Sequence, residues 1–377
     1  MIAFCALVAV VSAAVSVSAL RRLRRLTLLR PVAGPPGERF RVSAIVPARD
    51  EAETLESALR TLLAQRGVDL QVILVDDHSS DATGGIADRL AFEDPRLKVI
   101  HDPPLPPGWL GKANAMQAGA GAATGDYLLF TDADVHHHPD SVASFVRALE
   151  AGRLDFISGL PIVEIRSFWE HVNVPMYVGG LGLADWMLER RGGPGASEAV
   201  AAGAFMLFRA RCFREIGGFE PVKGDMLDDL GIARLLHRQR RPMGHRFAPE
   251  CMRVQLFHGN RAAFWAPTKN ILVAVEGFEW LAPILVVLNA AFYLIPPATA
   301  AWGISAGSPA LALAGLGAYA VQYAGALPLR GIFKFGLVKY AAFPLVAVNT
   351  AACMARALYH HARGEVFWRG RGIRVKG

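Results

Sequence analysis

The segment YLLFTDADV, residues 127–135, decides the fold class of this chain. Its first four residues are apolar or aromatic, as in a strand that is buried on both faces of a parallel sheet. Asp132 and Asp134 follow this strand, and residues two apart in an extended segment share a face. Ligands of open α/β sheets bind at the carboxyl ends of the strands. We expect the two acids to hold a divalent cation that carries phosphate oxygens; the alternative is a solvated turn with a helix cap.

Strand and helix patterns alternate on both sides of this segment. Apolar runs at residues 41–47, 70–75 and 97–100 read as strands, and the first is expected to break at Pro47. A helical pattern or a helix-start signal follows each run. This alternation predicts an α/β fold with a mostly parallel sheet and right-handed crossovers. A further strand is expected at residues 201–209.

Charged residues stand where the predicted strands end and the predicted helices begin. Asp76 and Asp77 end the second strand, Lys112 opens a helix, and Asp228 and Asp229 open another. Carboxylates at a helix N-terminus are favoured by the helix dipole, so capping is an alternative role for the last pair.

The histidines and cysteines do not predict a metal site. Three consecutive histidines, residues 136–138, cannot all point one way along an extended chain, so we expect them mostly in a loop. The four cysteines are scattered without a CxxC pair, which disfavours a disulfide framework or structural zinc site and fits a reducing compartment.

The composition indicates membrane segments beside a globular part. The 377 residues are 53% hydrophobic and 19% charged, and the mean hydropathy is +0.29, which is too apolar for an ordinary soluble domain. Residues 2–20 carry no charge and are followed by RRLRR, so they can span a bilayer with the following chain in the cytoplasm. A cleaved signal peptide is disfavoured because no positive region precedes the apolar run.

The C-terminal third contains further apolar runs at residues 280–302, 310–327 and 337–359. Arg330 and Lys334 favour the cytoplasm, as does the basic tail, yet a third span would separate them. The last run is therefore either a span or a re-entrant or interfacial helix. We predict a multi-pass protein of the cell (inner) membrane with a cytoplasmic catalytic domain.

Five regions follow from these patterns. They are an N-terminal anchor (1–20), a basic and Pro/Gly-rich linker (21–40), the α/β domain (41–270), C-terminal membrane helices (271–361) and a basic tail (362–377). Residues 164–190 are aromatic and sparsely charged; they read either as a core helix pair or, as we favour, as an interfacial segment that meets lipid.

The net charge of +7 and the sequence pI of about 9.4 come largely from arginines that flank apolar stretches. Anionic headgroups are therefore the expected partners of these clusters. Zinc-finger spacing and aromatic residues interleaved with basic ones are absent from the sequence, so nucleic acid is not an expected partner. The sequence gives no indication of which proteins, if any, bind this chain.

The order and spacing of the charged sites resemble family 2 glycosyltransferases of the GT-A fold, over about residues 41–270. The resemblance is carried by IVPARDE (45–51), Asp76-Asp77, Lys112, the DxD motif and Asp228-Asp229. A narrower resemblance, to the branch associated with hopanoid and carotenoid glycosylation, is carried by PPLPPGWLGK (103–112), FWEHVNVPM (168–176), Lys269-Asn270 and FWRGR (367–371).

The resemblance implies a role for each matched residue. Pro47, Arg49 and Glu51 would line the nucleotide pocket, and Asp77 with Asp76 would accept hydrogen bonds from uracil. Lys112 would approach the uracil or the diphosphate as a point charge. Asp132 and Asp134 would hold Mg²⁺ or Mn²⁺ against the diphosphate of a UDP-sugar. Asp229, with Asp228 beside it, would be the general base that deprotonates the acceptor hydroxyl.

The implied activity is transfer of one sugar, with inversion, from a UDP-sugar to a hydroxyl of a lipid of isoprenoid, hopanoid or carotenoid type. Three positions depart from the pattern: Asp228 replaces the usual Glu, Asn114 stands where the hopanoid branch often has Trp, and HGNR (258–261) with Phe264-Trp265 replaces Gln-x-x-Arg-Trp. Because processive synthases share that last motif, its loss favours single transfer.

Three rival functions remain open. A processive polysaccharide synthase is the nearest, and product length would distinguish it. A nucleotidyltransferase would need a Gly-rich phosphate loop where this chain has PARDE (47–51). A non-catalytic membrane scaffold would not need Lys112, the DxD motif and Asp229 together.

Overall fold

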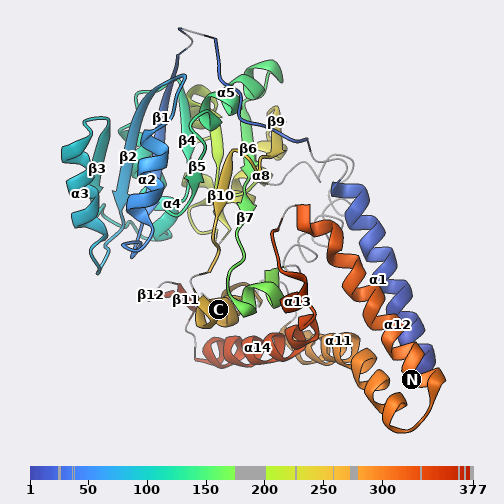
Figure 1. The fold of residues 1–377 in the computed structure, drawn as a ribbon. Coiled ribbons are helices and arrows are strands. Elements are labelled where there is room, and N and C mark those ends of the chain that lie inside the picture. The colour runs from blue at the N-terminus through green and yellow to red at the C-terminus, as the bar shows by residue number, and fades with distance from the viewer. Residues whose placement is uncertain are drawn as a thin grey trace. The chain divides into compact units, whose positions relative to one another are not determined.

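The computed structural model describes residues 1–23, 27–35, 37, 39–174, 201–225, 227–257, 259–271, 279–331, 333–363, 366–368 and 371–373. The chain divides into two compact units (Figure 1). The α/β unit comprises Leu26–Val163 and Ala184–Gln255, and the helical unit comprises Met1–Arg25, Glu164–Leu183 and Leu256–Gly377. This division differs from the expected one, because residues 164–183 and 256–270 group with the terminal helices.

The α/β unit is built on a seven-stranded sheet of order β3-β2-β1-β4-β8-β6-β9. Its strands are β1 (Phe40–Ala48), β2 (Val68–Asp76), β3 (Leu97–His101), β4 (Tyr127–Phe130), β6 (Phe156–Leu160), β8 (Met206–Arg209) and β9 (Met243–Phe247). The pairings of β1, β2, β3 and β4 are parallel, as is β6 with β9, whereas β8 is antiparallel to both β4 and β6. The predicted α/β fold with a mostly parallel sheet is confirmed.

Two strand boundaries differ from the prediction. β1 continues through Pro47 to Ala48, because β4 pairs only as far as Ile45 and the missing N–H of Pro47 therefore costs no bond on that side. β8 begins at Met206 rather than near Ala201, and residues 201–205 form a turn.

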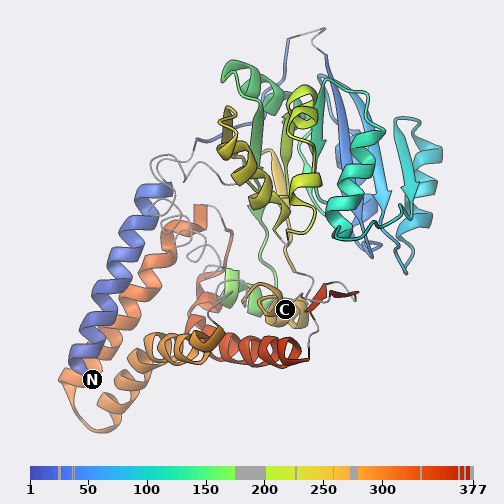
Figure 2. The ribbon, with the colours of Figure 1, turned by 180° about the vertical axis from the view of Figure 1, so that it is seen from behind.

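Helices cover both faces of the sheet. They are α2 (Leu55–Leu63), α3 (Thr83–Glu93), α4 (Gly111–Gly121), α5 (Ser141–Ala151), α7 (Ala210–Glu215), η2 (Glu220–Val222) and α8 (Asp228–Arg238). Figure 1 shows α2 in front of the sheet, and Figure 2 shows α4 and α7 on the opposite face. The amphipathic pattern explains this arrangement: α2, for example, buries the leucines that were spaced for one helix face.

A second, three-stranded sheet has the order β5-β10-β7, from β5 (His136–His137), β10 (Met252–Val254) and β7 (Ile162–Val163). The expectation that the three histidines lie mostly in a loop was therefore wrong for His136 and His137, which pair with β10. His137 is buried with Nε2 3.1 Å from Thr131 Oγ1, and burial lowers its pKa to about 3. A neutral, buried imidazole stabilises the end of β4 rather than forming a histidine metal cluster.

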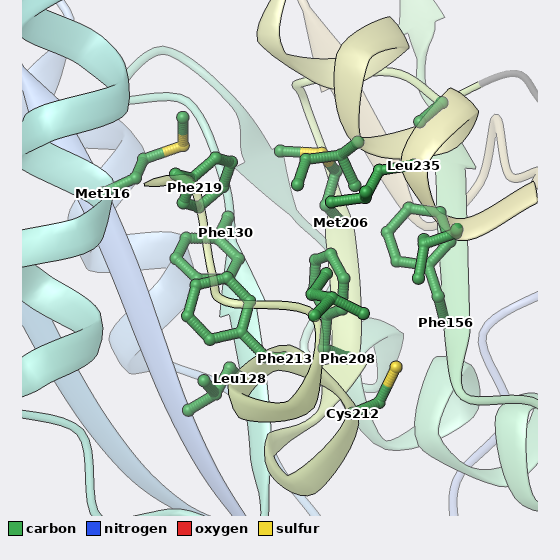
Figure 3. Close-up of a cluster of buried hydrophobic side chains, with 14 of the residues drawn as sticks. Met116, Leu128, Phe130, Phe156, Met206, Phe208, Cys212, Phe213, Phe219 and Leu235 are labelled. Atoms are coloured by element: carbon green, nitrogen blue, oxygen red, sulfur yellow. The ribbon is translucent and has the colours of Figure 1, made fainter. Parts of the chain in front are cut away.

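The core of the α/β unit is an aromatic cluster around Phe130, the last residue of β4 (Figure 3). The Phe130 ring is fully buried, with ring centroids 5.0 Å from Phe219, 5.1 Å from Phe213 and 5.8 Å from Phe208. The contacts with Phe219 and Phe208 are edge-to-face, and aromatic contacts of this kind add to the energy of burial. The cluster therefore fixes the strand end from which the DxD motif extends.

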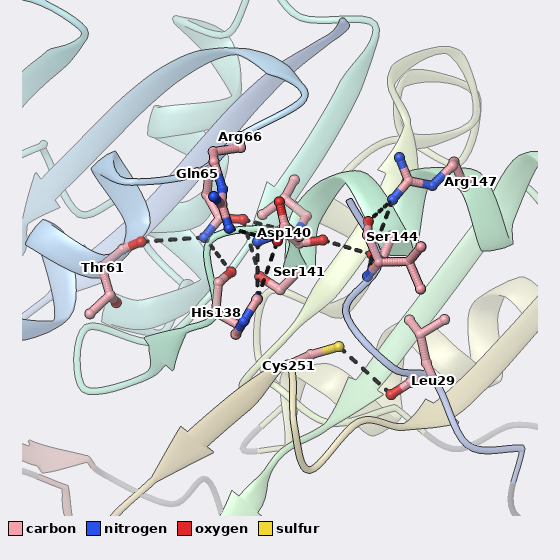
Figure 4. Close-up of polar contacts among 12 residues, drawn as sticks. Leu29, Thr61, Gln65, Arg66, His138, Asp140, Ser141, Ser144, Arg147 and Cys251 are labelled. Atoms are coloured by element: carbon pink, nitrogen blue, oxygen red, sulfur yellow. Dashed lines mark hydrogen bonds and ion pairs between the residues drawn. The ribbon is translucent and has the colours of Figure 1, made fainter. Parts of the chain in front are cut away.

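Residues 27–32, here called the strap, were expected to belong to a linker and instead pack on the α/β unit (Figure 4). Leu28 bridges Phe247 of β9, with Leu29 N donating to Phe247 O at 2.9 Å and Phe247 N donating to Thr27 O at 3.0 Å. Farther along, Val32 N donates to Ser144 Oγ at 2.9 Å. β9 is an edge strand, and its open N–H and C=O groups explain why a linker-like sequence is held here.

The helical unit contains α1 (Ile2–Leu23), α9 (Gly259–Trp265), α10 (Thr268–Ile271), η4 (Glu279–Leu281), α11 (Ala282–Ser305), α12 (Pro309–Ala326), η5 (Leu327–Gly331), α13 (Leu337–Tyr340), η6 (Phe343–Leu345), α14 (Val346–Ala362), β11 (Val366–Trp368) and β12 (Arg371–Ile373). By length and composition, the stretches Ala282–Ser305 and Pro309–Arg330 could cross a membrane, and α1 has a shorter apolar stretch, Ile2–Ser18.

Residues 168–174 are helical and belong to the interior of the helical unit. Glu170 and Ser167 form a reciprocal cap, in which Ser167 N donates to Glu170 Oε2 at 2.6 Å and Glu170 N to Ser167 Oγ at 3.4 Å. Asn173 Nδ2 donates to Ala263 O of α9 at 2.9 Å. Residues 170–174 are buried, so this part is a core helix rather than the lipid-facing segment that we favoured.

Parts of several predicted features lie outside the described residues. They are Arg24 and Arg25, residues 175–190, His258, the side chains of Lys269 and Asn270, Arg369 and Gly370 of the FWRGR motif, and residues 374–377 of the basic tail.

Candidate functional site

Asp132 and Asp134 extend from the carboxyl end of β4 as predicted. Both are half-buried, and they alternate with the buried Ala133 and Val135, so the two acids share a face. The preceding Thr131 Oγ1 donates to Ala204 O at 2.8 Å, which joins this turn to residues 201–205.

Lys112 is the second residue of α4 and forms an ion pair with Asp132. Its Nζ lies 2.7 Å from Asp132 Oδ1, and both side chains are partly exposed. The helix N-terminus on which Lys112 stands also points positive charge toward this place. Lys112 and the DxD motif, 20 positions apart in sequence, are thereby brought together at the sheet edge.

Asp229 lies at the start of α8 and is held by two backbone amides. Gly203 N donates to Asp229 Oδ2 at 3.0 Å, and Leu230 N donates to Oδ1 at 2.8 Å. The first of these bonds ties α8 to the turn that precedes β8. Asp229 is therefore more than a helix cap, because one carboxylate oxygen faces a distant segment.

Gly203 is the point at which the charged side chains converge. A methyl group on its Cα would lie 3.1 Å from Lys112 Nζ, 3.7 Å from Asp132 Oδ2 and 3.7 Å from Asp229 Oδ2. Only a residue without a side chain leaves this space open. We did not single out Gly203 from the sequence, where it lies in a run of small residues that we read as part of a strand.

The charges of this cluster shift one another's pKa. Burial raises the pKa of Asp228 and of Asp229, against the opposing effect of the Lys112 ammonium. Burial lowers the pKa of Lys112, but Asp132, Asp228 and Asp229 together raise it above its usual range. Asp228 Oδ2 is buried without a hydrogen-bond partner among the described residues.

These residues fit a divalent cation that is shared with a phosphorylated ligand. Three carboxylates surround one ammonium, so the cluster has excess negative charge, and an oxygen of Asp228 has no hydrogen-bond donor. Within the part of the chain that the structure describes, no group of three or more His, Cys, Asp or Glu side chains is arranged to hold a metal alone. Mg²⁺ is commonly held by one or two carboxylates together with substrate phosphates.

The other predicted ligand-binding residues lie at the ends of β1 and β2. Arg49 Nη1 donates to Asp77 O at 3.2 Å and lies 3.7 Å from Asp77 Oδ2, with both side chains mostly buried. Asp77 Oδ1 is 3.1 Å from His78 Nδ1. His78 has a positive φ of 59°, a conformation that is often found at functional sites.

Asp76, Glu51 and Pro47 lie in the same part of the α/β unit, and their roles in ligand binding stay predictions. Asp76 Oδ1 accepts from Ser79 N at 3.1 Å, and its Oδ2 is 3.3 Å from His101 Nδ1, so its carboxylate is used within the β2–α3 loop. Glu51 N donates to Thr83 Oγ1 at 2.8 Å. Pro47 lies within β1 beside Val75. The structure thus groups Arg49 with Asp77, and Lys112 with Asp132, Asp228 and Asp229.

Comparison with known proteins finds glycosyltransferases that match part of this chain. Residues 43–217 match the family model described as Glycosyl transferase family 2. Curated relatives include the succinoglycan biosynthesis protein ExoO of Rhizobium meliloti, 35% identical over 33% of this chain and 34% of the relative. Glycosyltransferase AglD of Haloferax volcanii is 33% identical over 31% of this chain and 19% of the relative. The alignments thus span about a third or less of these relatives.

A solved structure shares the fold over nearly the whole chain. The mannosyltransferase PcManGT from Pyrobaculum calidifontis, in complex with GDP-Man and Mn²⁺, superposes with a TM-score of 0.51 at 18% identity, covering 95% of this chain and 99% of that one. This likeness confirms the GT-A-like α/β fold.

Proposed function

We propose that this chain is a membrane-bound, inverting transferase that moves one sugar from a UDP-sugar to a lipid hydroxyl, a proposal supported by the match of residues 43–217 to the glycosyl transferase family 2 model. The convergence of Lys112, Asp132 and Asp229 on Gly203 carries the proposal. It joins a motif suited to a diphosphate with a carboxylate suited to deprotonating an acceptor. Both are needed for a single in-line displacement at the anomeric carbon.

The leaving diphosphate is the proposed ligand of Lys112 and the DxD motif. Lys112 would donate to a phosphate oxygen as a compact charge, exchanging part of its contact with Asp132 for the ligand. Asp132 and Asp134 would hold Mg²⁺ or Mn²⁺, which supplies charge stabilisation for the leaving group when bound. The fixed positions of Lys112 and Asp132 avoid reorganisation as that charge develops.

Recognition of the nucleobase is assigned to Asp77 rather than to Asp76. Asp77 is held by Arg49 at the carboxyl ends of β1 and β2, where ligands of such sheets bind. Both oxygens of Asp76 are already used by Ser79 and His101. A carboxylate suits an N–H donor of uracil; because the solved neighbour is in complex with GDP-Man, guanine nucleotides belong in any test.

Asp229 is the proposed general base. Its position is set by Gly203 N and Leu230 N, and its raised pKa brings a carboxylate closer to the basicity that proton abstraction requires. Asp228 contributes negative charge beside it.

A lipid acceptor is supported by the apolar surface of the helical unit. Exposed leucine, isoleucine, valine and tryptophan side chains occur along α1, α11 and α12, where water-facing helices would carry polar residues. Such surfaces are expected in contact with lipid tails. An acceptor hydroxyl that resides in a membrane would thus be available to the same protein.

The arrangement of the helical unit supports one membrane topology. α1 and α12 run parallel, because Cys5 and Val8 pack with Ala318 and Ser16 lies at Gly325. Arg21 and Arg330 therefore belong to the same end of the pair, as expected for a cytoplasmic side. α14 (17 residues) is not among the candidate spans, and the apolar stretch of α1, Ile2–Ser18, is equally short; we assign α1 as the span because Arg21 follows it at the end shared with Arg330. With α1, α11 and α12 crossing the membrane and α14 interfacial, every basic cluster would be cytoplasmic, and we propose this topology.

The transferase is tested by nucleotide release in neutral detergent. UDP- and GDP-sugars are assayed with Mg²⁺ or Mn²⁺, with and without extracted host lipid, and with EDTA. We expect lipid-stimulated release from one UDP-sugar, abolished by EDTA, and a product that carries one sugar. Release from a GDP-sugar alone would overturn the UDP assignment, and a polymeric product would favour the processive synthase. Failure to bind or hydrolyse any sugar nucleotide would overturn the proposal.

The dependence of kcat/KM on pH should report the pKa of Asp229, which burial raises. Because the base acts only when ionised, kcat/KM should rise with pH through a pKa above the ordinary aspartate range. Lys112→Met removes an ammonium that lowers this pKa, so the acidic limb should move to higher pH, whereas Lys112→Arg should hold it near the wild-type position. The measurement is the pH at which kcat/KM reaches half its maximum on the acidic side of the profile, and not the maximal value of kcat/KM. A limb that Lys112→Met leaves in place would exclude Asp229 as the titrating group.

Gly203→Ala should reduce transfer by about tenfold to a hundredfold, because small displacements of catalytic groups have effects of that size. The new methyl would come within 3.1 Å of Lys112 Nζ, and the flexible lysine is the group that would move. Gly85→Ala is the matched control, because a Cβ at this α3 position meets nothing within 4 Å. Steady-state rates and the melting temperature of both variants would be compared; equal rates would show that the space at Gly203 is not used.

A further inference from the structure

The Thr131 side chain connects the end of β4 to the turn that holds Asp229. Thr131 Oγ1 donates to Ala204 O at 2.8 Å, and the neighbouring Gly203 N donates to Asp229 Oδ2 at 3.0 Å. Thr131 also directly precedes Asp132 in the chain. One hydroxyl therefore joins the two segments that carry the carboxylates of the proposed transfer reaction.

The Thr131 hydroxyl has a second partner, the ring of His137. His137 Nε2 lies 3.1 Å from Thr131 Oγ1, and both side chains are buried. A hydroxyl carries one hydrogen, and the Ala204 carbonyl can only accept. Thr131 therefore donates to Ala204 and accepts from His137. Burial lowers the pKa of His137 to about 3, so the ring is neutral and its single N–H is at Nε2.

Three contacts fix the position of His137 itself. Its backbone N donates to Thr61 Oγ1 of α2 at 2.9 Å, and in β5 it pairs with Met252 of β10. Its ring centroid lies 6.0 Å from that of Phe205, which packs on Phe145 of α5 with ring centroids 4.1 Å apart. The imidazole is thus held by α2, by the three-stranded sheet and by the core, and it passes their position on to the end of β4.

We propose that His137 is a positioning residue for Asp229, an inference that rests on the proposed role of Asp229 as general base. It acts through Thr131 on the turn of residues 201–205, whose Gly203 amide holds that carboxylate. A catalytic group must be kept close to its productive geometry by neighbours that are themselves locked in place. The hydrogen bonds from His137 supply such neighbours, because each runs from a packed element to the next.

The turn, rather than the strand end, is the part that should move when these bonds are lost. Thr131 N donates to Ile45 O of β1 at 3.1 Å, which holds the strand end independently of the hydroxyl. The turn keeps a second anchor, because Ala202 N donates to Ser158 Oγ of β6 at 2.9 Å. We therefore expect a displaced turn in a folded protein. Small displacements of catalytic groups lower rates by about tenfold to a hundredfold.

The test compares Thr131→Val and His137→Leu with His137→Gln in the full-length chain. Valine keeps the shape of threonine, leucine fills much of the ring volume without a donor, and the glutamine amide can donate in place of Nε2. The first two variants should lower kcat by about tenfold to a hundredfold with little change in affinity for the sugar nucleotide, and His137→Gln should recover most of the rate. The double variant should be no slower than Thr131→Val, since both changes break one chain of bonds.

The pH dependence of kcat/KM separates positioning from a loss of stability. Burial raises the pKa of Asp229, and Lys112 and the N–H groups of Leu230 and Gly203 oppose that rise. A turn that moves away takes the Gly203 donor with it. The acidic limb should therefore move to higher pH in Thr131→Val and His137→Leu, whereas partial unfolding would lower the maximum without moving the limb.

Amide hydrogen exchange of residues 201–205 gives a readout that needs no activity. Loss of one hydrogen bond should speed exchange in this turn by about fivefold in Thr131→Val and His137→Leu, and not in His137→Gln. Leu62→Val is the matched control, because Leu62 lines the same small cavity as Thr131 and His137 and its shortening breaks no hydrogen bond. It should keep kcat within about twofold and exchange at the wild-type rate.

Several outcomes would overturn the positioning role. Wild-type kcat in Thr131→Val or His137→Leu would show that this chain of bonds does not place the base. An equal loss in Leu62→Val would show that any weakened packing has the same effect. Unchanged exchange of residues 201–205 in both variants would overturn this inference alone, whereas absence of sugar transfer by the wild-type chain would overturn the proposed function.

Discussion

Asp229→Asn should lower the rate of sugar transfer by about 10²- to 10⁴-fold, the range that general-base catalysis contributes. The amide keeps an oxygen that can accept from Gly203 N or Leu230 N, as Asp229 does at 3.0 and 2.8 Å. It cannot take a proton from the acceptor. Affinity for the nucleotide sugar, measured by calorimetry, should change little, because Lys112 and Asp132 remain. The loss should therefore appear in kcat.

Two comparisons make this result interpretable. Glu220→Gln removes an exposed carboxylate whose ion pair is with Lys223, and it should leave the rate within about twofold, as surface pairs contribute little. Asp228→Asn changes the neighbouring acid, whose Oδ2 has no hydrogen-bond partner in the described part of the chain. A larger loss in Asp228→Asn than in Asp229→Asn would transfer the assignment of the base to Asp228.

Most of the sheet could be predicted from local patterns. The β1, β2 and β4 strands are apolar runs, and each ends in the charged residues that we identified as site candidates. Parallel strands place such residues at one edge. Asp132 therefore lies near Lys112 through a general rule of α/β folds rather than through any feature unique to this chain.

The position of Gly203 could not be predicted in this way. It depends on β8, which enters antiparallel between β4 and β6, and strand order is a property of long-range packing. The pattern at residues 201–209 indicated extended chain, but not where the extension begins. Asp229 was identified as an acid at a helix start, yet its contact with Gly203 N also required that strand order.

The strap and residues 168–174 show a second limit of prediction from local sequence patterns. Pro and Gly residues near the strap indicated a linker, whereas the bonds that join Thr27 and Leu29 to β9 are backbone bonds, which depend little on side-chain identity. For residues 168–174, an apolar, aromatic composition fits lipid contact and protein contact equally. This helix contacts residues that are far away in the sequence, Asn260 and Ala263, so its burial could not be read from its own composition.

Phe130→Ala should destabilise the α/β unit by about 3–5 kcal/mol, the usual cost of truncating a buried phenylalanine. The side chain is fully buried and packs on three other rings, so the cavity would lie inside a well-packed cluster. For a unit of this size the melting temperature should fall by about 6–20 °C. Thermal unfolding of the detergent-solubilised chain, followed by fluorescence, is the measurement.

Phe92→Ala is the control, because the Phe92 side chain is 94% exposed and its loss should change stability by less than about 0.5 kcal/mol. Phe130→Leu should fall between the two, since it keeps most of the buried volume. Because Phe130 is followed by Thr131 and Asp132, a relaxed cluster would also loosen the strand end that positions Asp132 against Lys112. We therefore expect Phe130→Leu to weaken sugar-nucleotide binding at temperatures where it is still folded. Wild-type binding by a destabilised Phe130→Leu would show that the DxD turn is held by its own contacts, such as Thr131 to Ala204, rather than by the aromatic cluster.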